Sequence, residues 1–430
     1  MNQNEKSTRW SRREFLGTSV AAGALGLGSS PREQGPATPA ELERLESAYR
    51  DNIYTQLLGV RPHLGAHEHL TRLGGSRMPR EVTDAMVEAN DYFVDMHELT
   101  EAAGKRVAEI MGAEAALVTS GAFSAMILGA AACLTGTDPE KIEALPQATW
   151  PKRDCIIQTA HRFDYDRAYR AAGMSIVEAT TREEFIAKIN DRTAMIAVLT
   201  AVEKQREFGP PLPLELAHPH SPEVMMPEEF IAIGRRTGVP VLIDMASDLP
   251  PAANLTRFID AGADLVVISG GKGIRGPQST GILAGRRDLI EAARLHAAPN
   301  GNLGRGMKVG KEEIVGLIVA LNRWIELDHD KVEESWNAKA RWLADQLQGI
   351  PGLTATYAIN TVGYADVYIQ WDEKIIPLTP DEAKEKLMHG EPRLAYDGVT
   401  VRTRCLRDGE EVLVARRLRE FFESEARQGD

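Results

Sequence analysis

Short apolar runs alternate with helical patterns between residues 99 and 268, and this alternation constrains the fold more than any other feature of the chain. The predicted strands lie at residues 115–118, 156–157, 175–177, 195–199, 241–243 and 265–268. Predicted helices lie at residues 124–134, 164–172 and 227–236, with a further helix start at the Thr181/Glu184 capping box. Strands that alternate with helices pair mainly in parallel, because each helix returns the chain to the same end of the sheet. The predicted fold class is therefore α/β, with a mainly parallel sheet covered by helices.

The segments on either side of this alternation have other patterns. Residues 42–58 form a charged amphipathic helical pattern that is typical of an arm. Two long helical patterns, residues 311–327 and 332–347, precede strands near residues 365–371 and 399–403, which predicts a smaller α+β domain. The predicted divisions are a signal segment at residues 1–30, an N-terminal arm and helix at 31–95, a large domain at 96–297 and a small C-terminal domain at 298–430.

Composition excludes several classes of protein. A hydrophobic content of 43% over 430 residues is enough to give cores to several structural units. Fifty Lys and Arg against 62 Asp and Glu give a net charge of −12, which argues against affinity for nucleic acid or for anionic membrane surfaces. Cys133, Cys155 and Cys405 lack the spacing of a disulfide framework or a zinc site and are expected as small core side chains.

The N terminus looks like a twin-arginine export signal. Arg12 and Arg13 stand in the run from residue 11 to 17, and a weakly apolar Gly/Ala-rich stretch continues to residue 28. That stretch is too short to span a bilayer. The alternative is a frayed basic terminus. Because this pathway moves folded proteins that usually carry a cofactor, the segment predicts periplasmic export with a cofactor bound, and a cytoplasmic location if the signal is not functional.

Chemistry concentrates in a glycine-rich segment, residues 264–281, where a buried strand leads directly into a loop that holds one lysine, Lys272. The spacing Gly-x-Gly-x-x-Gly at residues 271–276 matches a dinucleotide motif, but Pro277 conflicts with the helix that this motif must open. The spacing Ser269-x-x-Lys272 matches penicillin-binding serine enzymes, but the Ser-Asp-Asn and Lys-Thr-Gly motifs of those enzymes are missing.

In the third interpretation, Lys272 supplies the amine that forms a Schiff base with pyridoxal 5′-phosphate. The lysine follows the carboxyl end of a strand, which is where open α/β sheets bind ligands. The glycines around it would let the loop backbone approach a phosphate, and Ser269 would donate its hydroxyl to the same group. A purely structural lysine is the alternative.

A pyridoxal site makes further demands that the sequence can meet. The ring nitrogen needs a carboxylate, and Asp244 ends an apolar strand, although capping a helix at residues 246–249 is an alternative role. The phosphate needs backbone N–H groups at a helix start, and Ser120, Gly121 and Ala122 form a strand-to-helix turn of small residues. His161 follows another strand and is a candidate to cover the face of the ring.

With these residues collected, the chain resembles fold-type I pyridoxal phosphate enzymes related to bacterial selenocysteine synthase, the L-seryl-tRNA(Sec) selenium transferases, and it is nearest the branch that includes D-glucosaminate-6-phosphate ammonia lyase. The motifs that carry the resemblance are Thr-Arg-Leu-Gly-Gly-Ser at residues 71–76, Gly-Ala-Glu-Ala-Ala at 112–116, Thr-Ser-Gly-Ala at 119–122, Ser-Asp-Leu-Pro-Pro at 247–251, Ser-Gly-Gly-Lys-Gly-Ile-Arg-Gly-Pro-Gln at 269–278 and Gly-Arg-Gly-Met-Lys-Val-Gly-Lys at 304–311. They extend over most of the mature chain.

The resemblance implies a role for each matched residue. Lys272 would hold the cofactor, Asp244 its ring nitrogen and His161 its face. Ser120, Gly121, Ala122 and Ser269 would hold its phosphate, and Arg305 and Lys308 would face an anionic group of the substrate. The resemblance also implies a homodimer or a larger homo-oligomer that acts on a small-molecule amino acid, without a nucleic acid partner.

Departures from the family pattern concern the substrate. The selenium transferases carry arginines where Gly75 and Lys308 stand here, and they bind tRNA through an N-terminal domain that this chain replaces with an export signal. The segment at residues 64–70 also differs from the metabolic branch. Its histidines and His63 are possible metal ligands, but one short segment rarely provides a complete site without an acid or cysteine partner from elsewhere in the chain, so no metal is predicted.

The predicted reaction is that of a lyase on an amino acid or amino sugar acid, with α-proton abstraction by Lys272 followed by β-elimination. Racemisation, aldol cleavage and aminotransfer are alternatives that use the same carbanion, and selenium or sulfur transfer on an aminoacyl-tRNA is disfavoured. Two other classes of function are a cofactor-loaded binding protein without turnover and an exported serine acyl-enzyme that uses Ser269.

Overall fold

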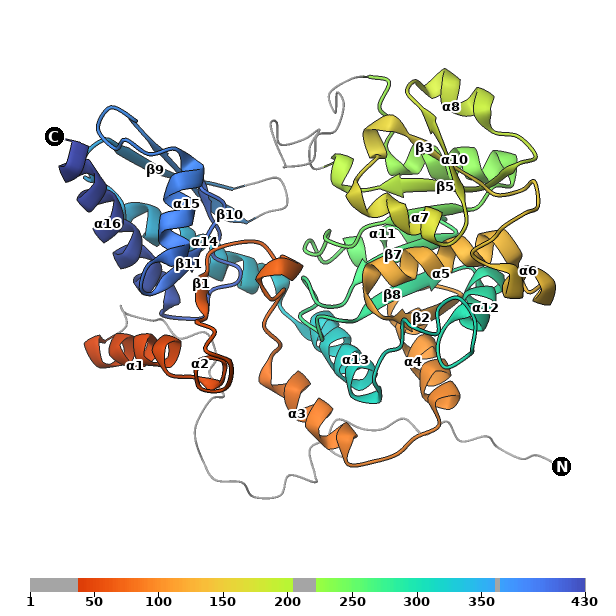
Figure 1. Cartoon of the computed structure of the whole chain (residues 1–430), viewed down its shortest axis with the longest axis horizontal. Coiled ribbons are helices and arrows are strands. Elements are labelled where there is room, and N and C mark those ends of the chain that lie inside the picture. Colours follow the sequence, from red (N-terminus) through yellow and green to blue (C-terminus); the bar gives the residue numbers. More distant parts are fainter. Residues whose placement is uncertain (1–37, 204–221, 360–363, 430) are drawn as a thin grey trace.

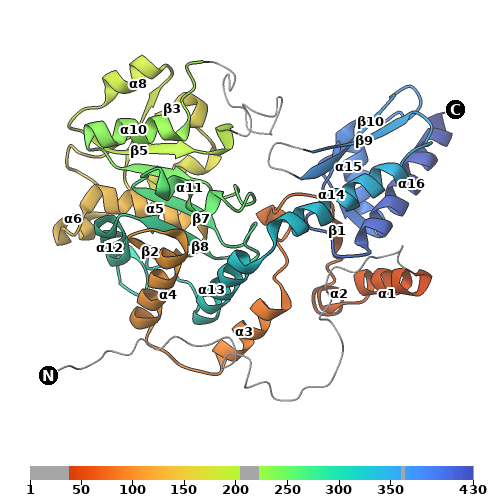
Figure 2. The same ribbon diagram turned by 180° about the vertical axis from the view of Figure 1, so that it is seen from behind.

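The computed structural model describes residues 38–203, 222–359 and 364–429. The predicted signal segment, residues 1–30, lies outside these residues. Two lobes are visible in Figure 1, and Figure 2 shows them from behind. No helix in the described part of the chain is long and apolar enough to cross a membrane.

The larger lobe is built on a seven-stranded sheet. Its strand order is β2-β8-β7-β6-β5-β3-β4. The strands are β2 (Ala115–Thr119), β3 (Asp154–Gln158), β4 (Ser175–Ala179), β5 (Thr193–Leu199), β6 (Val241–Asp244), β7 (Leu265–Ser269) and β8 (Gly281–Gly285). Only β8 runs antiparallel to its neighbours in this sheet. The predicted α/β class with a mainly parallel sheet is therefore confirmed.

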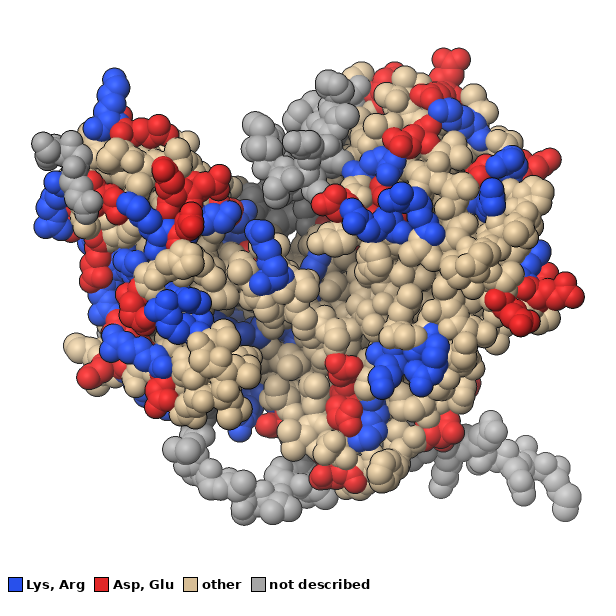
Figure 3. All heavy atoms as spheres, viewed as in Figure 1, with Lys and Arg blue, Asp and Glu red and all other residues tan. Residues whose placement is uncertain are grey.

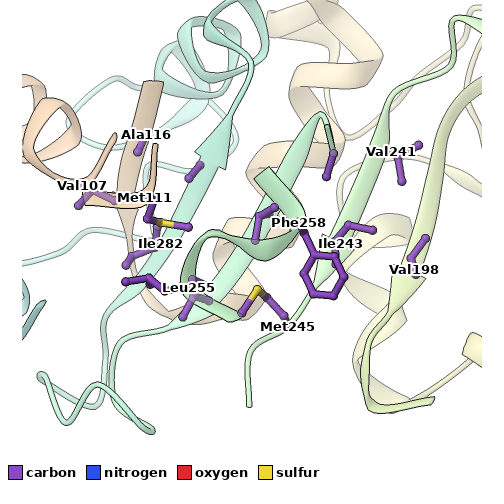
Figure 4. Close-up of a cluster of buried hydrophobic side chains, with 14 of the residues drawn as sticks. Val107, Met111, Ala116, Val198, Val241, Ile243, Met245, Leu255, Phe258 and Ile282 are labelled. Atoms are coloured by element: carbon purple, nitrogen blue, oxygen red, sulfur yellow. The ribbon is translucent and has the colours of Figure 1, made fainter. Parts of the chain in front are cut away.

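Helices cover both faces of the sheet, because successive strand residues point to opposite faces and almost all of them are apolar. Val241 and Ile243 pack on one face, whereas Leu242 packs on the other. The first face is covered by α3 (Arg80–Asn90), α4 (Met96–Met111), α8 (Arg182–Lys188), α10 (Pro227–Thr237), α11 (Asn254–Asp260) and α13 (Lys311–Glu326). Figure 4 shows part of this core, with Met111, Ile243 and Phe258 around α11. The second face is covered by α5 (Gly121–Thr135), α7 (Arg167–Ala171) and α12 (Arg287–His296), and α6 (Pro139–Ala144) packs against α5.

The smaller lobe has its own hydrophobic core. It contains an antiparallel sheet of β9 (Leu353–Ile359), β10 (Ala365–Trp371) and β12 (Thr400–Val401), in the order β12-β10-β9. Around that sheet lie α14 (His329–Gln346), α15 (Pro380–His389) and α16 (Glu410–Gly429). A separate parallel pair joins β1 (His63–Gly65) to β11 (Arg393–Ala395), so a segment from the N-terminal part of the chain belongs to this lobe.

The N-terminal arm differs from its prediction. Residues 42–58 form two helices, α1 (Pro39–Arg50) and α2 (Ile53–Leu58), instead of one. Asn52 separates them, because its side chain accepts hydrogen bonds from the backbone N–H groups of Tyr54 and Thr55 and thereby caps α2. The apolar side chains of α1, Leu42 and Leu45, pack against the core of the smaller lobe.

The hydrophobic cores do not change at residue 298, where the small domain was predicted to begin. α13 contributes Ile314, Leu317 and Trp324 to the core of the larger lobe, whereas α14 contributes Leu343 to that of the smaller lobe. The change of core therefore falls between these two consecutive helices. Helical periodicity gives no information about which sheet a helix covers, so the sequence pattern alone could not place this point.

Candidate active site

The predicted cofactor residues lie at the carboxyl ends of the strands of the large sheet. β2, β3, β6 and β7 all run in the same direction, so their carboxyl ends lie on the same side of the sheet. Ser120 follows β2, and His161 ends a single 3-10 turn (Thr159–His161) after β3. Asp244 is the last residue of β6, and Ser269 is the last residue of β7, three residues before Lys272. The folded sheet thus brings together segments that are more than a hundred residues apart in the chain.

The loop that carries Lys272 is packed tightly against other backbone. A Cβ at Gly273 would lie 2.1 Å from the carbonyl oxygen of Leu249, and one at Gly271 would lie 2.5 Å from the Cα of Gln278. Contacts this short exclude any side chain at these two positions. At these two positions the glycines therefore allow the loop to fold against protein backbone, and the predicted approach of the loop to a phosphate stays a prediction.

Asp244 lies at the carboxyl end of β6, the middle strand of the sheet, and is buried with 3% of its surface exposed. Its Oδ1 accepts a hydrogen bond of 3.0 Å from the backbone N–H of Ala246, yet no helix follows at residues 246–249, so the alternative role as a helix cap is not realised. Burial raises the pKa of Asp244 from 3.8 to about 6, and the positive charge of Lys272 acts in the opposite direction. The two charges are therefore close enough to influence each other.

The start of α5 offers unpaired backbone donors beside these two residues. Ser120 occupies the N-cap position but makes no side-chain capping bond, so the first N–H groups of a 15-residue helix have no side-chain partner. Gly121 has φ +80°, and a Cβ there would meet nothing closer than the carbonyl oxygen of Ser279 at 4.0 Å. Gly281 approaches the same turn from behind, because a Cβ on it would lie 2.4 Å from the carbonyl carbon of Gly121.

His161 lies in the core and has no open face. Its exposed fraction is 0%, its Nδ1 accepts a hydrogen bond from the backbone N–H of Leu199, and its Nε2 lies 3.0 Å from the carbonyl oxygen of Met225. Phe230 packs edge-on against the ring, with centroids 4.8 Å apart. Burial lowers the pKa of His161 to about 4, so the ring is neutral. The buried ring and its hydrogen bond with Leu199 of β5 suit a structural residue that links the segment after β3 to β5. The predicted role of His161 in covering the face of a cofactor stays a prediction.

Arg305 and Lys308 lie on the connection between α12 and α13, and both side chains are exposed. Neither belongs to the group of residues that line a cavity next to Lys272. Their predicted contact with substrate stays a prediction.

The sequence reasoning missed a positively charged cavity between the two lobes, which we call the interlobe cavity. It measures about 300 Å³ and is lined by His69, Arg77, Arg275, Ser335, Trp336, Lys339, Arg404, Cys405, Leu406, Arg407 and Asp408. The positive charge of Lys272 contributes to lowering the pKa of His69, so this cavity adjoins the lysine although Lys272 does not line it. Figure 3 shows the molecule hollowed between its lobes. A usable signal was Arg275, which stands three residues after the lysine in the glycine-rich loop.

The residues at the strand ends fit pyridoxal 5′-phosphate chemically. The open space beside Gly121 and the first N–H groups of α5, which have no side-chain partner, suit a phosphate. Ser120 and Ser269 stand at the ends of β2 and β7, which both pair with β8. Buried Asp244 suits a protonated ring nitrogen, and the amine of Lys272 suits an aldehyde. Fold and site together define an α/β enzyme with a lysine and a buried carboxyl group at the strand ends of its large lobe.

Comparison with known proteins identifies the family. The chain is 33% identical over 319 residues to 5′-C-glycyluridine monooxygenase-decarboxylase of a Streptomyces species, covering 72% of this chain and 74% of that protein. It is 27% identical over 393 residues to D-glucosaminate-6-phosphate ammonia lyase of Salmonella typhimurium, covering 87% and 99%. Identity to the L-seryl-tRNA(Sec) selenium transferase of Hyphomonas neptunium is 25% over 329 residues, covering 68% and 65%. No family profile matches the chain.

Solved structures agree with this relationship. A D-glucosaminate-6-phosphate ammonia-lyase structure superposes with a TM-score of 0.74 at 25% identity, covering 87% of this chain and 99% of that one. A serine palmitoyltransferase of S. paucimobilis with bound PLP superposes with a TM-score of 0.52 at 14% identity, which shows the fold alone, over 83% of this chain and 86% of that one. The chain belongs to the family of fold-type I, pyridoxal phosphate-dependent enzymes related to selenocysteine synthase.

Proposed function

We propose that this enzyme is a lyase that removes the α proton of an amino acid or amino sugar acid and then eliminates a β substituent, releasing ammonia and a keto acid. The observation that carries the proposal is the placement of Lys272 beside the buried carboxyl group of Asp244 at the strand ends, where each charge influences the other. The similarity to an ammonia lyase over 87% of the chain supports the same reaction type.

The roles of the residues follow from their positions. When bound, pyridoxal phosphate supplies an aldehyde that takes up the substrate amine and a protonated ring that accepts the electron pair of the broken Cα–H bond. The amine of Lys272 takes the α proton. Asp244 is mainly ionised at neutral pH, since its pKa is about 6, and it keeps a proton on the ring nitrogen. With the cofactor bound, departure of the β substituent with its own bonding pair would leave a Cα–Cβ double bond, and water would hydrolyse the resulting enamine to the keto acid and ammonia.

Decarboxylation is a second candidate, because the relative with 33% identity is a monooxygenase-decarboxylase. In that reaction the Cα–carboxylate bond breaks in place of the Cα–H bond, and the same Lys272 and Asp244 would serve. Racemisation, aldol cleavage and aminotransfer remain alternatives within the same site. Selenium transfer on tRNA is the least favoured, because the match to the selenium transferase covers 65% of that protein.

Absorption and product analysis together test the proposal. We expect the purified enzyme to be yellow, and we expect Lys272→Ala to abolish both the visible band and turnover. Lys105→Ala, which removes an exposed lysine on α4, should change neither. Incubation with D- and L-amino acids and with amino sugar acids should release ammonia and a keto acid in equal amounts. Carbon dioxide release would support decarboxylation, and a colourless protein in the presence of added pyridoxal phosphate would refute the site.

We also propose export through the twin-arginine pathway. The support is the Arg12-Arg13 pair followed by Phe15, Leu16 and an apolar stretch. Replacing both arginines with lysine should move the protein from the periplasmic to the cytoplasmic fraction. An unchanged distribution between the two fractions would contradict the proposal.

A further inference from the structure

The interlobe cavity joins three parts of the chain that are remote in sequence. His69 and Arg77 come from the segment before α3, Arg275 comes from the lysine loop, and residues 404–408 come from the smaller lobe. A volume of about 300 Å³ matches the lower end of the range for small-molecule sites. Because Arg275 contributes to its lining, the cavity lies next to the loop that holds Lys272.

Positive charge exceeds negative charge in the cavity. Three of its cations have carboxylate partners. Arg77 donates to Glu410 at 2.8 and 2.6 Å, Lys339 pairs with Asp408 at 2.7 Å, and Arg404 pairs with Glu68.

Arg275 and Arg407 have no such partner. Among the described residues, no carboxylate lies at ion-pair distance from either guanidinium group, and Arg275 donates its Nε–H to the backbone carbonyl of Arg77 at 2.9 Å. Burial, together with the nearby charges of Arg323 and Arg77, lowers the pKa of Arg275 to about 10. A half-buried cation such as Arg275 is costly without a counter-ion unless a ligand supplies the negative charge, and the exposed Arg407 adds a second positive charge at the same cavity.

The backbone of Arg275 adds an independent observation. Its φ is +61°, and it is the only non-glycine residue of the described chain with positive φ. This region of backbone space is costly for a long side chain, and such outliers cluster at functional sites. The surrounding loop fixes Arg275 in this conformation, because its N–H donates to the carbonyl of Lys272 at 2.9 Å and the N–H of Gly276 donates to that of Gly270 at 2.8 Å. The loop therefore holds Arg275 in an unfavourable backbone conformation that places its guanidinium group at the cavity.

We propose that Arg275 and Arg407 bind a doubly charged anionic part of the substrate, so the substrate is an amino acid that carries a phosphate or a second carboxylate. This inference rests on the proposed function, since the substrate must reach Lys272 with its amine. One carboxylate would neutralise one guanidinium group, whereas two guanidinium groups without partners match a phosphate dianion or two carboxylates. Planar guanidinium groups bind both kinds of anion through paired N–H donors.

Anion binding to the cofactor-loaded enzyme tests the site without turnover. In that form the cofactor phosphate would occupy its own site, for which the N terminus of α5 is our candidate, so added anions would report on other sites. We expect inorganic phosphate and malonate to bind at least about 10-fold more tightly than acetate in isothermal titration calorimetry at constant ionic strength. Equal binding of acetate and phosphate would overturn the dianion assignment.

Arg275→Asn is the informative variant, because asparagine tolerates positive φ and the loop should keep its shape. We expect it to weaken phosphate binding at least about 10-fold, and we expect Arg407→Gln to weaken it by a smaller factor because Arg407 is exposed. Arg236→Gln removes an exposed charge on α10 and should leave binding unchanged. Unchanged phosphate affinity in Arg275→Asn, with the visible band intact, would overturn this inference and leave the proposed lyase standing.

Matched substrates identify the source of the charge. D-glucosaminate 6-phosphate and D-glucosaminate differ only in the phosphate, and glutamate and glutamine differ only in the distal carboxylate. A preference in kcat/KM for the charged member of either pair that disappears in Arg275→Asn supports the assignment and tells phosphate from carboxylate. A preference for the charged member that survives in Arg275→Asn would overturn it. Turnover of no amino acid at all would count against the proposed function, while the anion titrations would still decide the site.

Discussion

The strand ends of the large sheet and the interlobe cavity carry charge in different ways. At the strand ends, Lys272 and Asp244 stand on loops and strands of a single sheet, and their opposite charges influence each other. In the interlobe cavity, five cations face one carboxylate among the lining residues, and the walls come from both lobes. The first arrangement pairs one positive with one negative charge, as suits a permanently held cofactor. The second has excess positive charge, as suits an anion that arrives and leaves with each turnover.

The largest expected effect concerns the strand ends. Asp244→Asn should lower kcat by at least about 100-fold, because a neutral amide cannot keep the ring nitrogen protonated. In the cofactor-free protein the same change should be stabilising at pH 7.5. The folded pKa of Asp244 is raised from 3.8 to about 6, so the stability contributed by its protonated form is complete below pH 3.8 and is lost as the pH rises through 6.

The expected gain in the cofactor-free variant is at most about 3 kcal/mol at pH 7.5 and should shrink towards pH 4. Chemical denaturation at both pH values, with and without cofactor, measures it. If cofactor-free Asp244→Asn gains no stability at pH 7.5, burial of the ionised Asp244 side chain does not destabilise the protein. The proposed difference between the strand ends and the interlobe cavity would then be wrong.

The next effect concerns the wall of the interlobe cavity. Glu410, with 1% of its surface exposed, accepts hydrogen bonds from Arg77 and, at 2.8 Å, from the hydroxyl of Tyr49. Glu410→Gln should destabilise the protein by about 2–4 kcal/mol, because Arg77 loses its counter-charge. Glu391→Gln, which removes an exposed pair with Arg61, should cost less than about 0.5 kcal/mol.

The difference in stability loss between Glu410→Gln and Glu391→Gln should depend on pH. Burial alone would raise the pKa of Glu410, but the hydrogen bonds and charge of Arg77 hold it below 4.5. The stability that Glu410 contributes is therefore present above pH 4.5 and is lost as the pH falls through the lowered pKa. Urea denaturation of both variants at pH 7 and pH 4 checks this, and an equal cost at the two values would show that the ion pair is not the cause.

The smallest effect distinguishes a core role from a cofactor role for His161. His161→Phe removes the acceptor for the N–H of Leu199 and the partner of the Met225 carbonyl, so it should cost about 1–3 kcal/mol. Because the folded pKa is lowered to about 4, the contribution of this histidine is present above pH 6.5 and is lost as the pH falls from 6.5 towards 4. The variant should lose less stability than the wild type over that interval.

Cofactor affinity completes the test of His161. Since the ring is fully buried, we expect the dissociation constant for pyridoxal phosphate to change less than about threefold in His161→Phe. A large rise in that constant, with stability unchanged, would return His161 to the role of a ring cover.

The sequence by itself determined six of the seven strands of the large sheet, their parallel direction and most of the candidate strand-end residues, but it missed the antiparallel strand β8. Apolar runs in the sequence show which strand residues are buried. The carboxyl ends of parallel strands lie on the same side of the sheet, so the sequence alone placed Lys272, Asp244 and Ser120 near one another. Only the tertiary structure decided that His161 is enclosed by α10, that α13 belongs to the larger lobe, and that Arg275 meets Arg77 and Arg407 in one cavity. The physical reason is that the pattern of apolar residues along a strand indicates how that strand is buried in its own sheet. Contacts between the two lobes depend on how their folded surfaces pack against each other, and a local sequence pattern holds no information about that packing.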